Sequence, residues 1–103
     1  MDSLPIACSL APQDLERRKQ ALQAVVTAVG QSEPLTNGLR FHFANDEGVQ
    51  QELIALIQFE RVCCPFLTFD LHFEHNNGPI SLSVTGPEGT RKFLGEVFGI
   101  PAA

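Results

Sequence analysis

Residues 67–85, LTFDLHFEHNNGPISLSVT, carry the clearest structural pattern of this chain. Apolar and polar residues alternate on both sides of Asn77-Gly78, a dipeptide typical of tight hairpins. A period of two residues predicts two antiparallel strands joined by a two-residue turn, each with one apolar and one polar face. A sheet built from such strands needs helices on its apolar face only.

An amphipathic helix is predicted before this hairpin. Asn45 or Asp46 can cap its first turn, and apolar residues follow at helical spacing as far as Cys63. Cys64 precedes Pro65, and a residue before proline is disfavoured in helical geometry. The helix is therefore expected to end at about Cys63.

The remaining elements follow from the same two periodicities. Alternation predicts an edge strand over residues 4–10 and a strand over residues 39–43, while helical spacing predicts helices over residues 12–30 and 86–98. The polar residues 33–38, which include Pro34 and Gly38, are typical of a turn. The predicted order is strand, helix, strand, helix, strand, strand, helix.

These elements predict one α+β domain over residues 1–103. We expect a two-layer sandwich: a mainly antiparallel sheet of three to four strands with its helices on one face. A chain of 103 residues is long enough for one such domain and too short to divide comfortably into two.

The composition argues against two classes of partner, nucleic acids and membranes. The formal net charge is −5 and the only basic cluster is Arg17-Arg18-Lys19, so nucleic-acid binding is not expected. The longest apolar run, residues 53–57, is far shorter than the roughly 20 residues of a membrane-spanning helix. The first residues, MDSLPIACSL, lack a secretory signal pattern, so a cytoplasmic location is expected.

Three cysteines stand out, because an odd number with two adjacent members suits a disulfide framework badly. On a helical wheel Glu60 lies in the middle of the apolar stripe, and Cys63 and Cys64 flank it one turn later. Cys8 lies on the apolar side of its predicted strand. All four side chains are therefore predicted to point into the layer between sheet and helices.

A buried carboxylate needs a local reason, because burying an unpaired charge is costly. Glu60 could hydrogen-bond the helix end, pair with a cation such as Arg18, accept a proton from a thiol, or ligate a metal ion. The plainer alternative is a partly exposed glutamate at the rim. For the cysteines the plainer alternative is packing as small apolar side chains.

The histidines argue against a protease-like catalytic triad. His42 and His72 alternate onto the polar face of the sheet, away from the predicted thiol layer, and His75 lies in the hairpin turn. This polar face is predicted to be a hydrated surface, with homodimer formation as the alternative.

Three segments also resemble a family of small bacterial proteins with an E-x-x-C-C-P-F core: FERVCCPFL at residues 59–67, VTGPEGT at 84–90, and ACSL at 7–10. Such proteins are associated with mercury and heavy-metal resistance contexts. The resemblance implies that Cys8, Glu60, Cys63 and Cys64 matter. One departure is Ala11, where the family has a Ser or Thr that caps the first helix.

The predicted function is capture of a soft metal ion or metalloid, such as Hg(II) or As(III), by Cys63, Cys64 and Cys8, with Glu60 as proton acceptor. Adjacent thiols without spaced pairs do not suit structural zinc. The first alternative is a thiol-dependent enzyme, either with Glu60 as the acid of an organomercurial-lyase-like reaction or with Cys63 and Cys64 cycling through a disulfide. The second is a protein-interaction module with structural cysteines.

Overall fold

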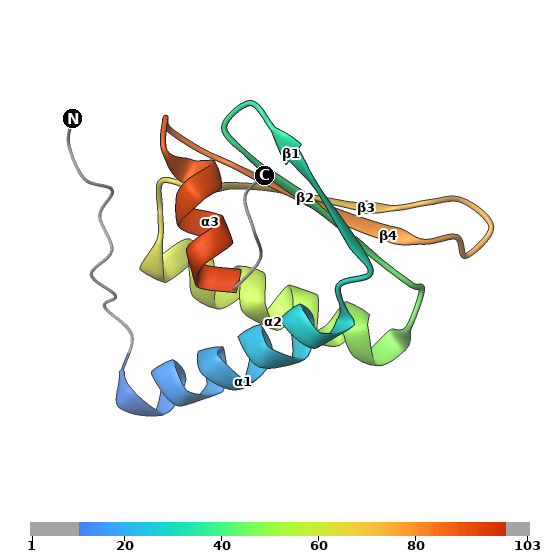
Figure 1. The fold of residues 1–103 in the computed structure, drawn as a ribbon. Helices are drawn as coiled ribbons and strands as arrows, with labels where there is room; N and C mark the ends of the chain where they lie inside the picture. The colour runs from blue at the N-terminus through green and yellow to red at the C-terminus, as the bar shows by residue number, and fades with distance from the viewer. Residues whose placement is uncertain (1–10, 99–103) are drawn as a thin grey trace.

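The computed structural model describes residues 11–98, which form three helices and a four-stranded sheet (Figure 1). The fold is the α+β sandwich expected from the sequence. The elements are α1 (Pro12–Ala28), β1 (Gln31–Leu35), β2 (Gly38–Phe43), α2 (Glu47–Cys63), β3 (Thr68–Phe73), β4 (Ile80–Thr85) and α3 (Thr90–Phe98).

The sheet has the strand order β1-β2-β4-β3, and every neighbouring pair is antiparallel. The two central strands, β2 and β4, come from different hairpins and pair from Gly38 opposite Thr85 to Phe43 opposite Ile80. A Cβ at Gly38 would stand 1.9 Å from the carbonyl oxygen of Val84. Glycine therefore permits this close approach of the central strands.

One face of the sheet is buried and the other is open. All three helices contribute to a single core with the apolar face of β2 and β4, which places the helices on the same side of the sheet (Figure 1). The buried members of this core are Ala21, Val25, Leu39, Phe41, Phe43, Leu53, Leu56, Ile80, Leu82, Val84 and Leu94. No helix within residues 11–98 is long and apolar enough to cross a membrane.

Both predicted ends of α2 are confirmed. The Asp46 carboxylate accepts a hydrogen bond of 3.0 Å from the backbone N–H of Val49, which satisfies one of the free donors of the first turn. At the other end Cys64 leaves helical geometry, with φ −131° and ψ 71°. Its backbone N–H still donates to the Glu60 carbonyl at 2.7 Å, so the thiol stays next to the helix end.

The turn predicted over residues 33–38 is wrong in part. Gln31–Leu35 forms the edge strand β1, and only residues 36 and 37 make the turn to β2. The sequence QSEPL has no apolar alternation because β1 is mostly exposed on both faces; backbone pairing with β2 holds it. The strand predicted over residues 4–10 lies outside the described residues.

The two-residue turn predicted at Asn77-Gly78 is also wrong, because residues 74–79 connect β3 to β4. Asn76 and Asn77 both have positive φ, 58° and 54°. Pro79 has no N–H to return a hydrogen bond to Glu74; the N–H of Gly78 donates to the Glu74 carbonyl at 3.2 Å instead. The hairpin itself is confirmed.

Candidate functional site

Three of the four predicted site residues, Glu60, Cys63 and Cys64, lie at the C-terminal end of α2. Glu60, Cys63 and Cys64 retain only 6%, 3% and 4% of their exposed area. The expectation that these three residues are buried is therefore confirmed. Cys8 falls outside residues 11–98, so its predicted place beside them is not described.

Glu60 is buried with two partners. One carboxylate oxygen, Oε2, accepts a hydrogen bond from Nε of Arg18 on α1, and the two groups form an ion pair. The other oxygen, Oε1, lies 3.7 Å from the Cys64 sulfur, which donates its S–H. Of the reasons considered for a buried Glu60, pairing with Arg18 and contact with a thiol are therefore both observed, and the rim position is excluded by the burial.

A second ion pair joins the same two helices. Arg17 donates to Glu52 at 3.1 Å, with 42% and 33% of these side chains exposed. The Arg18 side chain is 22% exposed and that of Glu60 only 8%. Two consecutive arginines thus tie α1 to α2, and the one closer to the core holds the carboxylate of the candidate site.

The surroundings of Cys64 keep its thiol protonated at neutral pH. Burial raises the pKa of this thiol to about 11, and the negative charge of Glu60 acts in the same direction. The positive charge of Arg18 opposes them only in part. The hydrogen bond to Glu60 in turn raises the pKa of Arg18, which stays charged. Cys64 is therefore a proton donor to Glu60 rather than a resting thiolate.

The two adjacent cysteines differ in state. Cys64 is a free thiol, whereas Cys63 is disulfide-bonded. Two sulfur ligands at this helix end therefore require reduction of Cys63. Within the described part of the chain, no group of three or more Cys, His, Asp or Glu side chains is placed to hold a metal ion. In this state Cys63, Cys64 and Glu60 therefore do not form a ready-made metal site.

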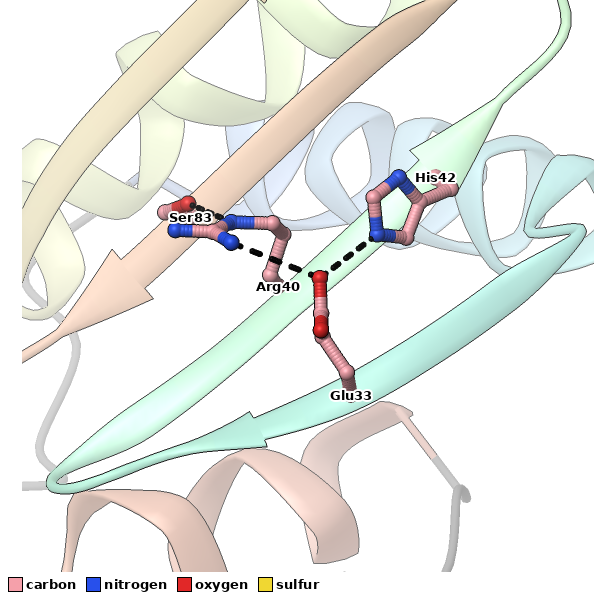
Figure 2. Close-up of polar contacts among 4 residues, drawn as sticks. All are labelled: Glu33, Arg40, His42 and Ser83. Carbon is pink, nitrogen blue, oxygen red and sulfur yellow. Dashed lines mark hydrogen bonds and ion pairs between the residues drawn. The ribbon is translucent and has the colours of Figure 1, made fainter.

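The histidines lie where the alternation predicts. His42 and His72 line a hollow on the open face of the sheet, and His75 is exposed in the hairpin connection. Figure 2 shows that Glu33 reaches from β1 toward β2, where its Oε1 lies 2.9 Å from Nε2 of His42 and 3.4 Å from an Arg40 nitrogen. Through the hydrogen bond with His42, and to a smaller extent the charge of Arg40, the pKa of Glu33 is lowered.

Sequence reasoning missed Glu33, because it placed this residue in a turn. A signal was present: Arg40 and His42 are basic neighbours on one strand face, and such a pair attracts a carboxylate from the adjacent strand. The register of β1 against β2 brings Glu33 opposite Arg40 and so supplies that carboxylate.

Comparison of the chain with protein families, with curated proteins and with solved structures gave no match. What the chain does is therefore inferred from its own residues. The covered side of the sheet holds the buried cysteines Cys63 and Cys64, and the open side holds exposed charged side chains.

Proposed function

We propose that this protein is a cytoplasmic binder of a soft, thiophilic metal ion or metalloid, of the Hg(II) or As(III) kind. The ligands are Cys63 and Cys64 in their reduced state, with Cys8 as a further sulfur. The observation that carries the proposal is the contact between the Cys64 sulfur and the Glu60 carboxylate, directly beside a second buried cysteine.

Proton transfer explains the carboxylate in this proposal. A metal ion binds the thiolate, so a protonated Cys64 must lose its proton as the metal arrives. The Glu60 oxygen that already receives the S–H is the nearest acceptor, at 3.7 Å. Arg18 holds this carboxylate in place through its other oxygen, which suits an acceptor better than the acid of a lyase-like reaction.

The ligand count favours some ions over others. Structural zinc sites take four protein ligands, whereas the described residues bring two sulfurs to this helix end. Thiolates are soft ligands that select soft metals. An ion satisfied by two or three sulfurs therefore fits better than zinc.

The test is titration of phosphine-reduced protein with Hg(II), As(III) and Zn(II), followed by native mass spectrometry and ultraviolet absorbance of metal–sulfur bonds. We expect one equivalent of Hg(II) or As(III) to bind more tightly than Zn(II), with proton release. The Cys63→Ser/Cys64→Ser double variant should lose this binding, and Cys8→Ser shows whether a third sulfur takes part.

The control variant is Glu52→Gln, which removes a carboxylate that pairs with an arginine between the same helices without contacting a thiol. It should bind metal like the wild type, whereas Glu60→Gln should slow binding at neutral pH. Undiminished Hg(II) binding by the double cysteine variant would contradict the proposal.

A further inference from the structure

The open face of the sheet carries a second candidate site, unrelated to the thiols. A hollow of about 560 Å³ lies over β2, β4 and β3, with polar side chains from all three strands. This volume falls within the range of small-molecule sites, roughly 300 to 1,000 Å³. The helices all lie on the opposite side of the sheet, so no described element covers the hollow.

The strand register places opposite charges on either side of one serine. Arg40 on β2 and Asp70 on β3 are both directly opposite Ser83 on β4. Neighbouring strands are about 4.8 Å apart, so the two charged residues start about 10 Å apart on the same face. The Arg40 side chain leans across β4, where its Nε donates to the Ser83 hydroxyl at 3.0 Å (Figure 2).

Both charges have unused capacity for hydrogen bonds. A guanidinium carries five N–H donors, and Arg40 uses one toward Ser83 and one, at 3.4 Å, toward Glu33. The Asp70 side chain makes no hydrogen bond or ion pair with any residue between 11 and 98, Arg40 included. A ligand can therefore contact both groups without breaking a buried interaction.

The charges around the hollow disfavour a ligand of one sign. A simple anion that approaches Arg40 meets the carboxylates of Glu33 and Asp70, and a simple cation that approaches Asp70 meets the guanidinium of Arg40. A dipolar ligand satisfies both ends at once. The hydroxyls of Ser81 and Ser83 line the space between them.

We propose that this open face binds a free α-amino acid, with its carboxylate on Arg40, its ammonium on Asp70 and its α-carbon above Ser83. In an α-amino acid both charged groups stand on one carbon, which suits a guanidinium that already reaches Ser83, the residue directly opposite Asp70. The rest of the hollow accommodates the ligand's side chain. This site is independent of the thiol site on the covered face.

The experiment is a nitrogen-15 NMR titration of the full chain with each of the common free L-amino acids at millimolar concentration. We expect saturable shifts of the amides of Arg40, Asp70 and Ser83 with at least one of them. The deamino and decarboxy analogues of the tightest ligand should each bind about tenfold more weakly or worse, because each lacks one charge-assisted contact.

Variants complete the test. Arg40→Gln and Asp70→Asn should each weaken binding by about tenfold or more, and both residues are on the surface, so the fold should persist in the same spectra. Arg61→Gln and Asp14→Asn, which change equal charges on the helices, should leave affinity unchanged. The proposal is overturned by no saturable shift with any amino acid, by a deamino analogue that binds as tightly as its parent, or by full binding in Asp70→Asn.

Discussion

The two sides of the sheet each carry a glutamate paired with an arginine, but in opposite environments. Glu60 and Arg18 lie between helices, with 8% and 22% of their side chains exposed. Glu33 and Arg40 lie on the open face, with 48% and 42% exposed. The same two residue types thus have different roles on the two sides. On the covered side Arg18 neutralises the buried carboxylate of Glu60. On the open side Glu33 and Arg40 hold each other's charges where water and ligands can still reach them.

Burial, more than the identity of the partners, determines what each of these two ion pairs can do. On the covered side, burial raises the pKa of Cys64 and makes its proton part of any binding event. On the open side, solvent weakens each ion pair, so Arg40 can exchange one partner for another at low cost.

Removal of the Arg18 cation on the covered side should lower the stability of the protein most. Arg18→Gln leaves the Glu60 carboxylate buried without its counter-charge, and such a loss costs about 3 kcal/mol of unfolding free energy. The loss is expected at the low end of the usual range, because the Arg18 side chain is itself 22% exposed. Urea denaturation at neutral pH measures the loss.

The matched variant is Arg40→Gln on the open face, whose unfolding midpoint should stay close to that of the wild type. Glu60→Gln should cost less than Arg18→Gln, because an unpaired arginine can turn its charged end toward water. Equal losses for Arg18→Gln and Arg40→Gln would mean that the two sides do not differ as described.

A smaller effect is expected in thiol reactivity. With Cys64 as the sole thiol, in Cys8→Ser/Cys63→Ser, alkylation should be slow at neutral pH and rise tenfold per pH unit toward its pKa of about 11. At pH 9 an ordinary cysteine of pKa 9.0 is half ionised, and the thiolate fraction of Cys64 should be about fiftyfold lower. Iodoacetamide labelling followed by mass spectrometry gives the rates.

The control places one cysteine on the exposed strand face, by Thr68→Cys in a chain whose own three cysteines are serine. This thiol should react at an ordinary rate. A Cys64 that reacts as fast as the control would show that the helix end is open to solvent.

The raised pKa of Cys64 also makes the stability of the protein depend on pH. Because this pKa lies above its value in the unfolded chain, Cys64 adds stability that is present below about pH 9 and is lost as the pH rises through 11.

The smallest effect is expected at Glu33. Its pKa is lowered below the ordinary 4.5, so its contribution to stability is present above that pH and is lost as the pH falls through the lowered value. Because Glu33 is exposed, Glu33→Gln should leave the unfolding midpoint at neutral pH equal to that of the wild type within error. The variant should only lose stability less steeply as the pH becomes acidic. A clear loss at neutral pH would assign Glu33 a structural role.

Much of the fold could be predicted because most of its helices and strands bury one face, on which apolar side chains recur at a regular spacing. The strands around Phe41, Leu71 and Leu82 alternate cleanly, and Asp46 and Pro65 bracket α2 by local chemistry alone. β1 could not be predicted, because an edge strand exposed on both faces has no apolar pattern and depends on pairing with its neighbour.

Part of the candidate site could likewise be predicted from the sequence, and part could not. Helical spacing was enough to place Glu60, Cys63 and Cys64 in the buried layer. Arg18 was one of several possible partners of Glu60, and sequence alone could not decide among them, because the two residues are 42 positions apart and only the packing of α1 on α2 brings them together. The alignment of Arg40 and Asp70 on Ser83 likewise depends on strand register.

The strand order β1-β2-β4-β3 places the second strand of each hairpin, β2 and β4, at the centre of the sheet. The chain consists of two successive helix-and-hairpin units, α1-β1-β2 and α2-β3-β4, set back to back so that like elements meet, α1 against α2 and β2 against β4. Each unit alone leaves one edge of its inner strand, β2 or β4, without a neighbouring strand. A chain cut between residues 43 and 47 would therefore yield two halves with matching unpaired edges, and rejoining those edges would rebuild the sheet about an approximate twofold axis.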